Sequence, residues 1–169
     1  MTAAGKWRAL VAAIGNPDRG DDGVGPAVAS RLRGRVPVGV RILETGGDVL
    51  ALIDAWDAFR SVIVVDAAAP IDRPGRIHRL DLASRPLPGR FAAASTHAFG
   101  LGEAVELARN LGRLPSRLVV YLIEGERFDI GGPLSLPVAA AIDQVADRIL
   151  EELAGRAPRH AAEGPADHA

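Results

Sequence analysis

Four ionisable side chains in this sequence could do chemistry together. Asp21 and Asp22 lie in a glycine-rich turn over residues 15–26. Asp66 follows an apolar run, and His97 follows a Ser-Thr pair. Carboxylates and an imidazole can transfer protons, and two carboxylates with one imidazole suit a divalent first-row metal. The chain has no cysteine, which removes thiolate nucleophiles and thiolate metal ligands.

Each of these residues also has a structural interpretation. Asp22 could cap the helix that follows it, and Asp21 is expected to be the structural member of the pair. Asp66 could form a turn after a buried strand, and His97 could be solvated or hydrogen-bonded in the first turn of a helix. The residue types and positions alone leave both interpretations open.

Apolar runs alternate along the chain with segments of helical periodicity. These patterns predict the strands and helices that must position the ionisable residues. Apolar runs and apolar–polar alternation predict strands at residues 7–14, 38–44, 61–66, 75–82 and 117–124. Apolar residues at helical spacing predict helices at residues 24–33, 48–59, 96–111 and 135–153. The alternating segment 75–82 is expected at a sheet edge, and the Pro-, Gly- and Ala-rich residues 83–94 are expected to form a loop.

This order of elements predicts an α/β fold, with a mainly parallel (mixed) sheet covered by helices on both faces. The carboxyl ends of parallel strands, and the helix N-termini that follow them, lie along one edge of such a sheet. Asp22, Asp66 and His97 are therefore predicted to converge at that edge. We expect one domain over residues 1–155 and a disordered Ala-, Pro- and His-rich tail over residues 156–169.

Weaker candidates lie at the same predicted edge. Gly46–Gly47 could let the backbone approach a ligand closely, or could form a plain turn. Glu124 could be functional, or could cap a helix or pair with an arginine. His78, on an alternating strand, is interpreted as a surface residue. His160 and His168 fall in the predicted tail and are too far apart for a compact metal-binding tract.

Composition and missing motifs exclude several classes of function. The net charge of −1 does not favour nucleic acid or an anionic membrane as a partner. No signal-peptide pattern or membrane-length apolar run is visible, so a cytoplasmic protein is expected. The Gly-x-Ser-x-Gly elbow, the Walker loop and the Gly-x-Gly-x-x-Gly fingerprint are all missing.

An ordered set of short motifs resembles the hydrogenase maturation protease family, over about residues 8–150. The matching blocks are residues 15–16, 20–25, 46–47, 64–67, 95–101, 123–124 and 132–138. The resemblance implies a three-layer αβα endopeptidase of the aspartic or metal-dependent type. Such enzymes trim the C-terminal extension of the nickel–iron hydrogenase large-subunit precursor.

The resemblance also implies roles for three residues. Asp22, Asp66 and His97 match the family's catalytic and metal-contacting residues, which are thought to contact nickel already loaded into the substrate. Another divalent metal could serve in vitro, and a monomer is expected. The chain departs from many relatives at Ala98, where they have glycine; so small a change should not disturb ligation.

Three questions stay open from the sequence. Either Asp22 or Asp66 could activate water as a general base, or the metal could polarise the carbonyl or the water. A nickel-dependent client-binding or chaperone module that does not cleave would use the same three ligands. Peptidyl-tRNA hydrolase is a less favoured alternative: Gly15-Asn16-Pro17 is similar to its opening motif, but the Tyr and the Thr-Arg-His-Asn block expected after it are missing.

Overall fold

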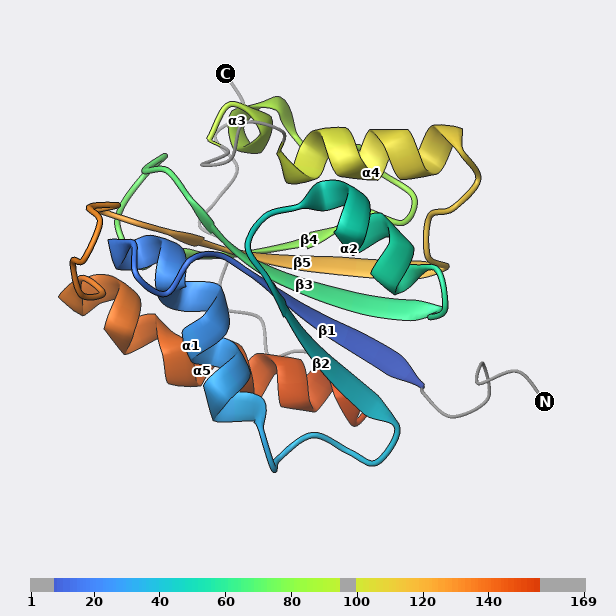
Figure 1. Cartoon of the computed structure of the whole chain (residues 1–169), viewed down its shortest axis with the longest axis horizontal. Coiled ribbons are helices and arrows are strands. Elements are labelled where there is room, and N and C mark those ends of the chain that lie inside the picture. Colours follow the sequence, from blue (N-terminus) through green and yellow to red (C-terminus); the bar gives the residue numbers. More distant parts are fainter. Residues whose placement is uncertain (1–7, 95–99, 156–169) are drawn as a thin grey trace, which may run out of the picture.

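The computed structural model describes residues 8–94 and 100–155. In these residues, five strands form one sheet in the order β2-β1-β3-β5-β4 (Figure 1). Four strands are parallel, and β4 pairs antiparallel with β5 at one edge. The strands are β1 (Ala9–Ile14), β2 (Val40–Thr45), β3 (Ser61–Ala68), β4 (Ile77–Asp81) and β5 (Arg117–Glu124).

Helices cover both faces of the sheet. Figure 1 shows α1 and α5 on one face, and α2, α3 and α4 on the other. The helices are η2 (Gly20–Gly23, a 3-10 turn), α1 (Val24–Leu32), α2 (Val49–Trp56), α3 (Gly89–Ala92), α4 (Leu101–Asn110) and α5 (Leu136–Leu153). The predicted three-layer αβα fold is therefore confirmed. Within the described residues, no helix has the length and apolar character needed to span a membrane.

The central strands are apolar on both sides because both of their faces are covered. Val64 of β3 belongs to the buried cluster under α2 and α4, whereas Val65, the next residue, belongs to the cluster under α1 and α5. Gly25 allows α1 to lie close against the sheet, since a Cβ there would be 2.3 Å from the carbonyl oxygen of Ile14. This close approach ties the first helix directly to the end of β1.

Two predicted elements need correction. The residues 83–94, expected to be a loop, contain the short helix α3, which Pro88 precedes and which buries Phe91 against the sheet. The predicted helix 96–111 is observed from Leu101 onward, and residues 95–99 lie outside the described residues. The predicted tail 156–169 also lies outside them.

A buried ionic cluster ties α5 to the sheet far from the strand ends discussed below. Glu152 is 2% exposed and accepts hydrogen bonds from Arg79 (2.7 and 3.1 Å), from Arg117 (2.6 Å) and from the Tyr121 hydroxyl. Burial acts to raise the pKa of Glu152, but the bonds from Arg79 and Tyr121 outweigh it, so the pKa lies below its usual range. The charged form of Glu152 therefore stabilises the fold.

Glu152→Gln should lower the free energy of unfolding by about 3 kcal/mol at neutral pH, because it leaves two arginines without their carboxylate. The pKa of Glu152 is lower in the folded protein than in the unfolded chain. The stabilisation that its charge gives is therefore present above the unfolded pKa of about 4.3, and it is lost as the pH falls through the folded pKa. Urea denaturation should therefore show a smaller difference in the free energy of unfolding between Glu152→Gln and wild type near pH 3 than at neutral pH.

Asp143→Asn is the matched control on the same helix. It removes an exposed ion pair with Arg31 and should change the free energy of unfolding by less than about 1 kcal/mol. Equal losses in the two variants would contradict the special contribution of the buried cluster.

Candidate active site

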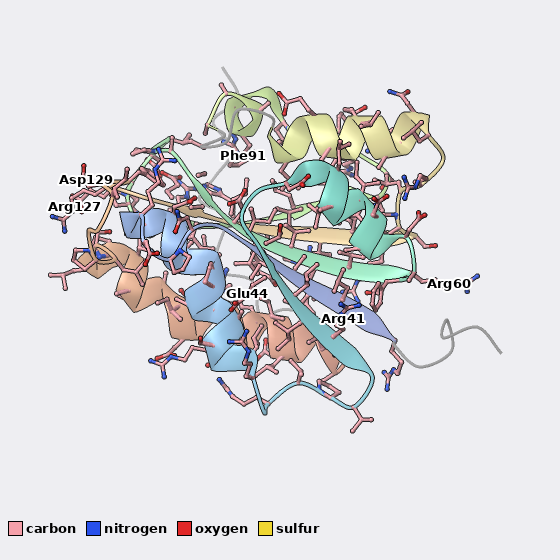
Figure 2. The ribbon with its side chains drawn as sticks, viewed as in Figure 1. Arg41, Glu44, Arg60, Phe91, Arg127 and Asp129 are labelled. Carbon is pink, nitrogen blue, oxygen red and sulfur yellow. The ribbon has the colours of Figure 1, made fainter. Side chains whose placement is uncertain are left out.

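The carboxyl ends of β1, β3 and β5 lie together at one end of the sheet. Figure 2 shows Arg127 and Asp129, in the loop after β5, at this end, and Arg60, which precedes β3, at the opposite end. The loops that follow the three strands therefore share one edge, where parallel α/β sheets bind ligands.

Asp22 lies in η2, between β1 and α1, and is 2% exposed. Its Oδ2 accepts a 2.8 Å hydrogen bond from the Asn16 N–H. Gly15 makes this tight turn possible: it has a φ of +141°, and a Cβ there would lie 1.9 Å from the Asp22 carbonyl oxygen. The N-cap of α1 is Gly23, with no side-chain capping bond, so the interpretation of Asp22 as the cap of this helix is wrong.

Asp66 lies on β3 itself, in register with Leu122 of β5, and is 4% exposed. The strand continues to Ala68, so Asp66 does not form a turn. Burial raises the pKa of Asp66 well above its usual range, and the charge of Asp22 raises it further, although an N–H bond from Ala67 (2.8 Å) opposes both. The structure thus brings Asp22 and Asp66 within electrostatic range of each other.

The third predicted site residue, His97, lies outside the described residues. Within the described part of the chain, no group of three His, Asp or Glu side chains could hold a metal ion. The described residues include two of the three predicted ligands, and the ligand role of all three stays a prediction.

Asp21 interacts with the loop after β5 rather than with Asp66. Its Oδ2 accepts from the N–H groups of Glu126 (2.7 Å) and Arg127 (3.0 Å), and Ser135 donates its N–H to Oδ1 (2.7 Å) and its hydroxyl to Oδ2 (2.8 Å). Burial acts to raise the pKa of Asp21, but the backbone hydrogen bonds from Arg127, Glu126 and Ser135 bring it below its usual range. Asp21 therefore fixes the loop between β5 and α5.

Sequence comparison identifies relatives of this chain. The sequence model of the family described as "Hydrogenase maturation protease" matches residues 26–152. "Hydrogenase expression/formation protein HupD" of Bradyrhizobium diazoefficiens is 35% identical over 150 residues, covering 84% of this chain and 74% of that protein. This chain belongs to the hydrogenase maturation protease family. The range matched by the family model contains Asp66 and His97 and begins after Asp22.

Solved structures of maturation proteases share the fold. The hydrogenase maturation protease HycI of Thermococcus kodakarensis is 27% identical, with a TM-score of 0.70 over 89% of this chain and 94% of that one. A hydrogenase 2 maturation peptidase from a Thaumarchaeota archaeon is 30% identical, with a TM-score of 0.66 over 86% and 97%. Family and fold together make this chain a hydrogenase maturation endopeptidase.

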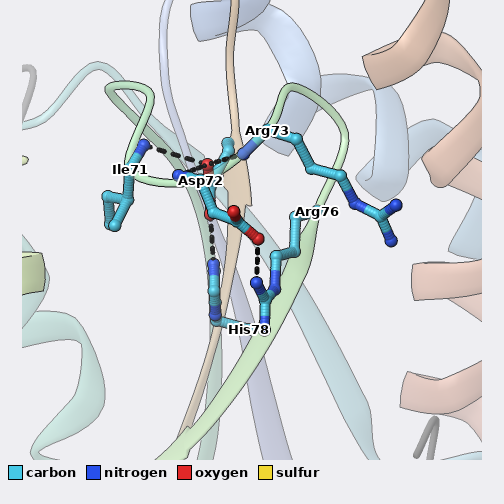
Figure 3. Close-up of polar contacts among 6 residues, drawn as sticks. Ile71, Asp72, Arg73, Arg76 and His78 are labelled. Carbon is cyan, nitrogen blue, oxygen red and sulfur yellow. Dashed lines mark hydrogen bonds and ion pairs between the residues drawn. The ribbon is translucent and has the colours of Figure 1, made fainter. Parts of the chain in front are cut away.

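Glu124, at the end of β5 in this protease, holds the loop after β3. Its Oε2 accepts from three successive N–H groups, those of residues 71–73, at 2.9, 2.8 and 2.9 Å. Figure 3 shows Ile71, Arg73 and His78 gathered around these contacts, which the dashed lines mark. Burial acts to raise the pKa of Glu124, but the bonds from His78 and from the backbone outweigh it, so the pKa is lowered.

The interpretation of His78 as a surface residue is wrong. Its side chain is 10% exposed, its Nε2 lies 2.6 Å from Glu124 Oε1, and its ring packs edge-on against Phe91, with 4.8 Å between centroids. His78 therefore joins the end of β5 to α3. The other weak candidate, Gly46–Gly47, follows β2, and a Cβ on Gly46 would meet no described atom within 4 Å.

Proposed function

We propose that this protease removes the C-terminal extension of a nickel–iron hydrogenase large-subunit precursor after nickel insertion. Membership of the family supports a hydrogenase precursor as the substrate. The observation that carries the proposal is the pair Asp22 and Asp66. Both carboxylates are buried, one in η2 after β1 and the other on β3, and they repel each other. Such a pair costs stability, which is typical of a functional site.

The donor set suits a divalent cation brought by the substrate. Two nearby carboxylates in a poorly solvated site repel, and a cation bound to both relieves the repulsion. With the imidazole of His97 they form a set that suits a first-row metal, while any thiolate ligands must come from the precursor because this chain has no cysteine. Asp22, Asp66 and His97 would therefore bind nickel only when the precursor presents it.

One carboxylate of the pair also suits the cleavage step. We assign Asp66 as general base: it takes a proton from a water molecule while the water oxygen adds to the scissile carbonyl. The proton then passes to the leaving nitrogen as the C–N bond breaks. Asp66 is 4% exposed, so the water that it deprotonates would be one held inside the site rather than bulk solvent. The nickel mainly fixes the substrate at this carboxylate.

The test is the mass of the precursor's C-terminal region. Nickel-loaded precursor incubated with the protease should lose a short peptide, seen by intact-mass measurement, and nickel-free precursor should keep its full mass. His97→Ala should leave the nickel-loaded precursor uncut. His160→Ala, in the predicted tail, is the matched control and should cleave as wild type does.

Three results would overturn parts of this proposal. Binding of the nickel-loaded precursor without a change in mass would favour the non-cleaving chaperone function. Equal cleavage of loaded and nickel-free precursor would contradict recognition through nickel. Full cleavage by His97→Ala would remove that residue from the site.

A further inference from the structure

Exposed large apolar side chains are concentrated at the edge of the sheet that also carries Asp22 and Asp66. Of the side chains that the structure describes, four follow the carboxyl ends of β2, β3 and β5: Leu50, Ile71, Ile130 and Leu136. Two more precede β2 and β5, at the opposite edge: Val38 and Leu111. Single exposed apolar residues are ordinary, whereas their concentration beside a pair of buried carboxylates indicates a surface for a partner.

Ile130 and Leu136 are the most exposed of these four, at 90% and 85%. Ile130 lies in the loop after β5, where it pairs with Arg19 through an isolated antiparallel bridge. The extended backbone of such a bridge suits threonine as well as isoleucine. Leu136 is the first residue of α5, a position where the helix dipole favours an acidic side chain. Local structure therefore does not require an apolar side chain at either position.

The loop that carries these two side chains is fixed to the turn that leads into η2. The N–H of Gly131 donates to the carbonyl of Asp18 (2.6 Å), and the N–H of Gly20 donates to the carbonyl of Gly132 (3.1 Å). The carboxylate of Asp21 accepts four further hydrogen bonds from the same loop and the start of α5. A loop that is already ordered loses little conformational freedom when a partner binds to it.

We propose that Ile130 and Leu136 form a docking surface for an apolar patch on the folded body of the hydrogenase precursor, outside the site of reaction. The inference rests on the proposed function, because the precursor must lie across this edge for its C-terminal extension to reach Asp22 and Asp66. A second copy of this chain bound to the same surface would cover that edge and hinder the precursor. Full burial of an exposed Leu or Ile side chain strengthens association by about tenfold or more.

The double variant Ile130→Thr/Leu136→Asp tests the docking surface with little effect on local structure. Threonine keeps a β-branched side chain at the bridge, and aspartate suits the first turn of a helix. With nickel-loaded precursor as the substrate, this variant should raise KM by about tenfold or more and leave kcat unchanged, because the reacting carboxylates are untouched. Ile130→Val/Leu136→Met keeps the surface apolar and should retain a KM close to that of wild type.

Val38→Thr/Leu111→Asp is the matched control. Both residues are exposed at the opposite edge, and the double variant makes equivalent changes there, so kcat and KM should stay at their wild-type values. Urea denaturation checks that every variant is folded.

Four results would overturn the docking surface. These are an unchanged KM in Ile130→Thr/Leu136→Asp, an equal rise of KM in the control, and a fall in kcat without a rise in KM. The fourth is a wild-type dimer in sedimentation velocity that Ile130→Thr/Leu136→Asp dissociates, because it would assign the surface to a second copy of this chain. If wild type leaves the nickel-loaded precursor uncut, the proposed function itself fails, which is a different outcome from cleavage with an unaltered KM.

Discussion

Asp66→Asn is expected to lower kcat/KM for the nickel-loaded precursor by about 100-fold or more. The amide cannot accept a proton from water and carries no charge to offer a cation. Both roles proposed for Asp66 are therefore lost in one nearly isosteric change. Initial rates of peptide release from a fixed precursor preparation give the measurement.

The same change should leave the free energy of unfolding equal to or above that of wild type. Ionised Asp66 is unfavourable in the folded protein, because burial and the charge of Asp22 both raise its pKa. Asparagine keeps an oxygen that can accept the 2.8 Å bond from the Ala67 N–H, while the repulsion disappears. Urea denaturation, set beside the rates, should thus separate the effect on stability from the effect on activity. Residues at functional sites often lower the stability of the fold.

Asp18→Asn is the matched control. Asp18 is exposed in the same turn as Asp22, and its substitution removes the same single charge. It should change neither rate nor stability appreciably. Full activity of Asp66→Asn, or a loss of activity that only follows a loss of folded protein, would contradict the assignment of Asp66 as general base.

The edge at which Asp22 and Asp66 meet was predictable from the chain because parallel topology determines it. Alternating strand and helix patterns imply that successive strands run the same way, so residues at their carboxyl ends gather at one edge. The predicted strand 117–124 matches β5 (Arg117–Glu124) at both ends, and the clearest strand pattern, residues 61–66, continues two residues further in β3 (Ser61–Ala68). A continuous apolar run of this kind indicates a strand whose two faces are both buried, and such a run can be read from the local sequence.

Long-range pairings were not predictable in the same way. His78 lies on an alternating strand, which indicates one solvent-facing side, but the partner that buries it, Glu124, is 46 residues away. Local pattern does not show that β4 pairs antiparallel with β5, and that pairing brings the two residues together. The helix α3 was missed for a related reason: it is held by the burial of Phe91 rather than by its own helical propensity.

The partners of Asp21 and Asp22 were likewise not predictable from local sequence. The two carboxylates are chemically identical neighbours in the sequence, and their partners decide their roles. The hydrogen-bond donors to Asp21 come from residues 105 to 114 positions away, whereas Asp22 interacts electrostatically with Asp66. The expectation that Asp21 is the structural member of the pair is confirmed, and the arrangement of η2 against the loop after β5 supplies the hydrogen bonds by which it acts.

Asp21→Ala should therefore be the most destabilising of these substitutions, with a loss of about 3–5 kcal/mol in the free energy of unfolding. It would leave three N–H groups and one hydroxyl without their acceptor, and each buried donor left unpaired costs about 1–3 kcal/mol before the loop relaxes or water enters. Asp21→Asn keeps one side-chain acceptor oxygen and should lose about half as much. Urea denaturation measures all three proteins.

Hydrogen exchange gives the local readout that separates this effect from general destabilisation. The amides of Glu126, Arg127 and Ser135, which donate to Asp21, should lose protection in Asp21→Ala under conditions where the central strands stay protected. Asp18→Ala, in the same turn but exposed, is the control and should leave these amides unchanged. Wild-type protection of the three amides in Asp21→Ala would mean that the loop after β5 is held by other contacts, and that Asp21 must be reconsidered as a third functional carboxylate beside Asp22 and Asp66.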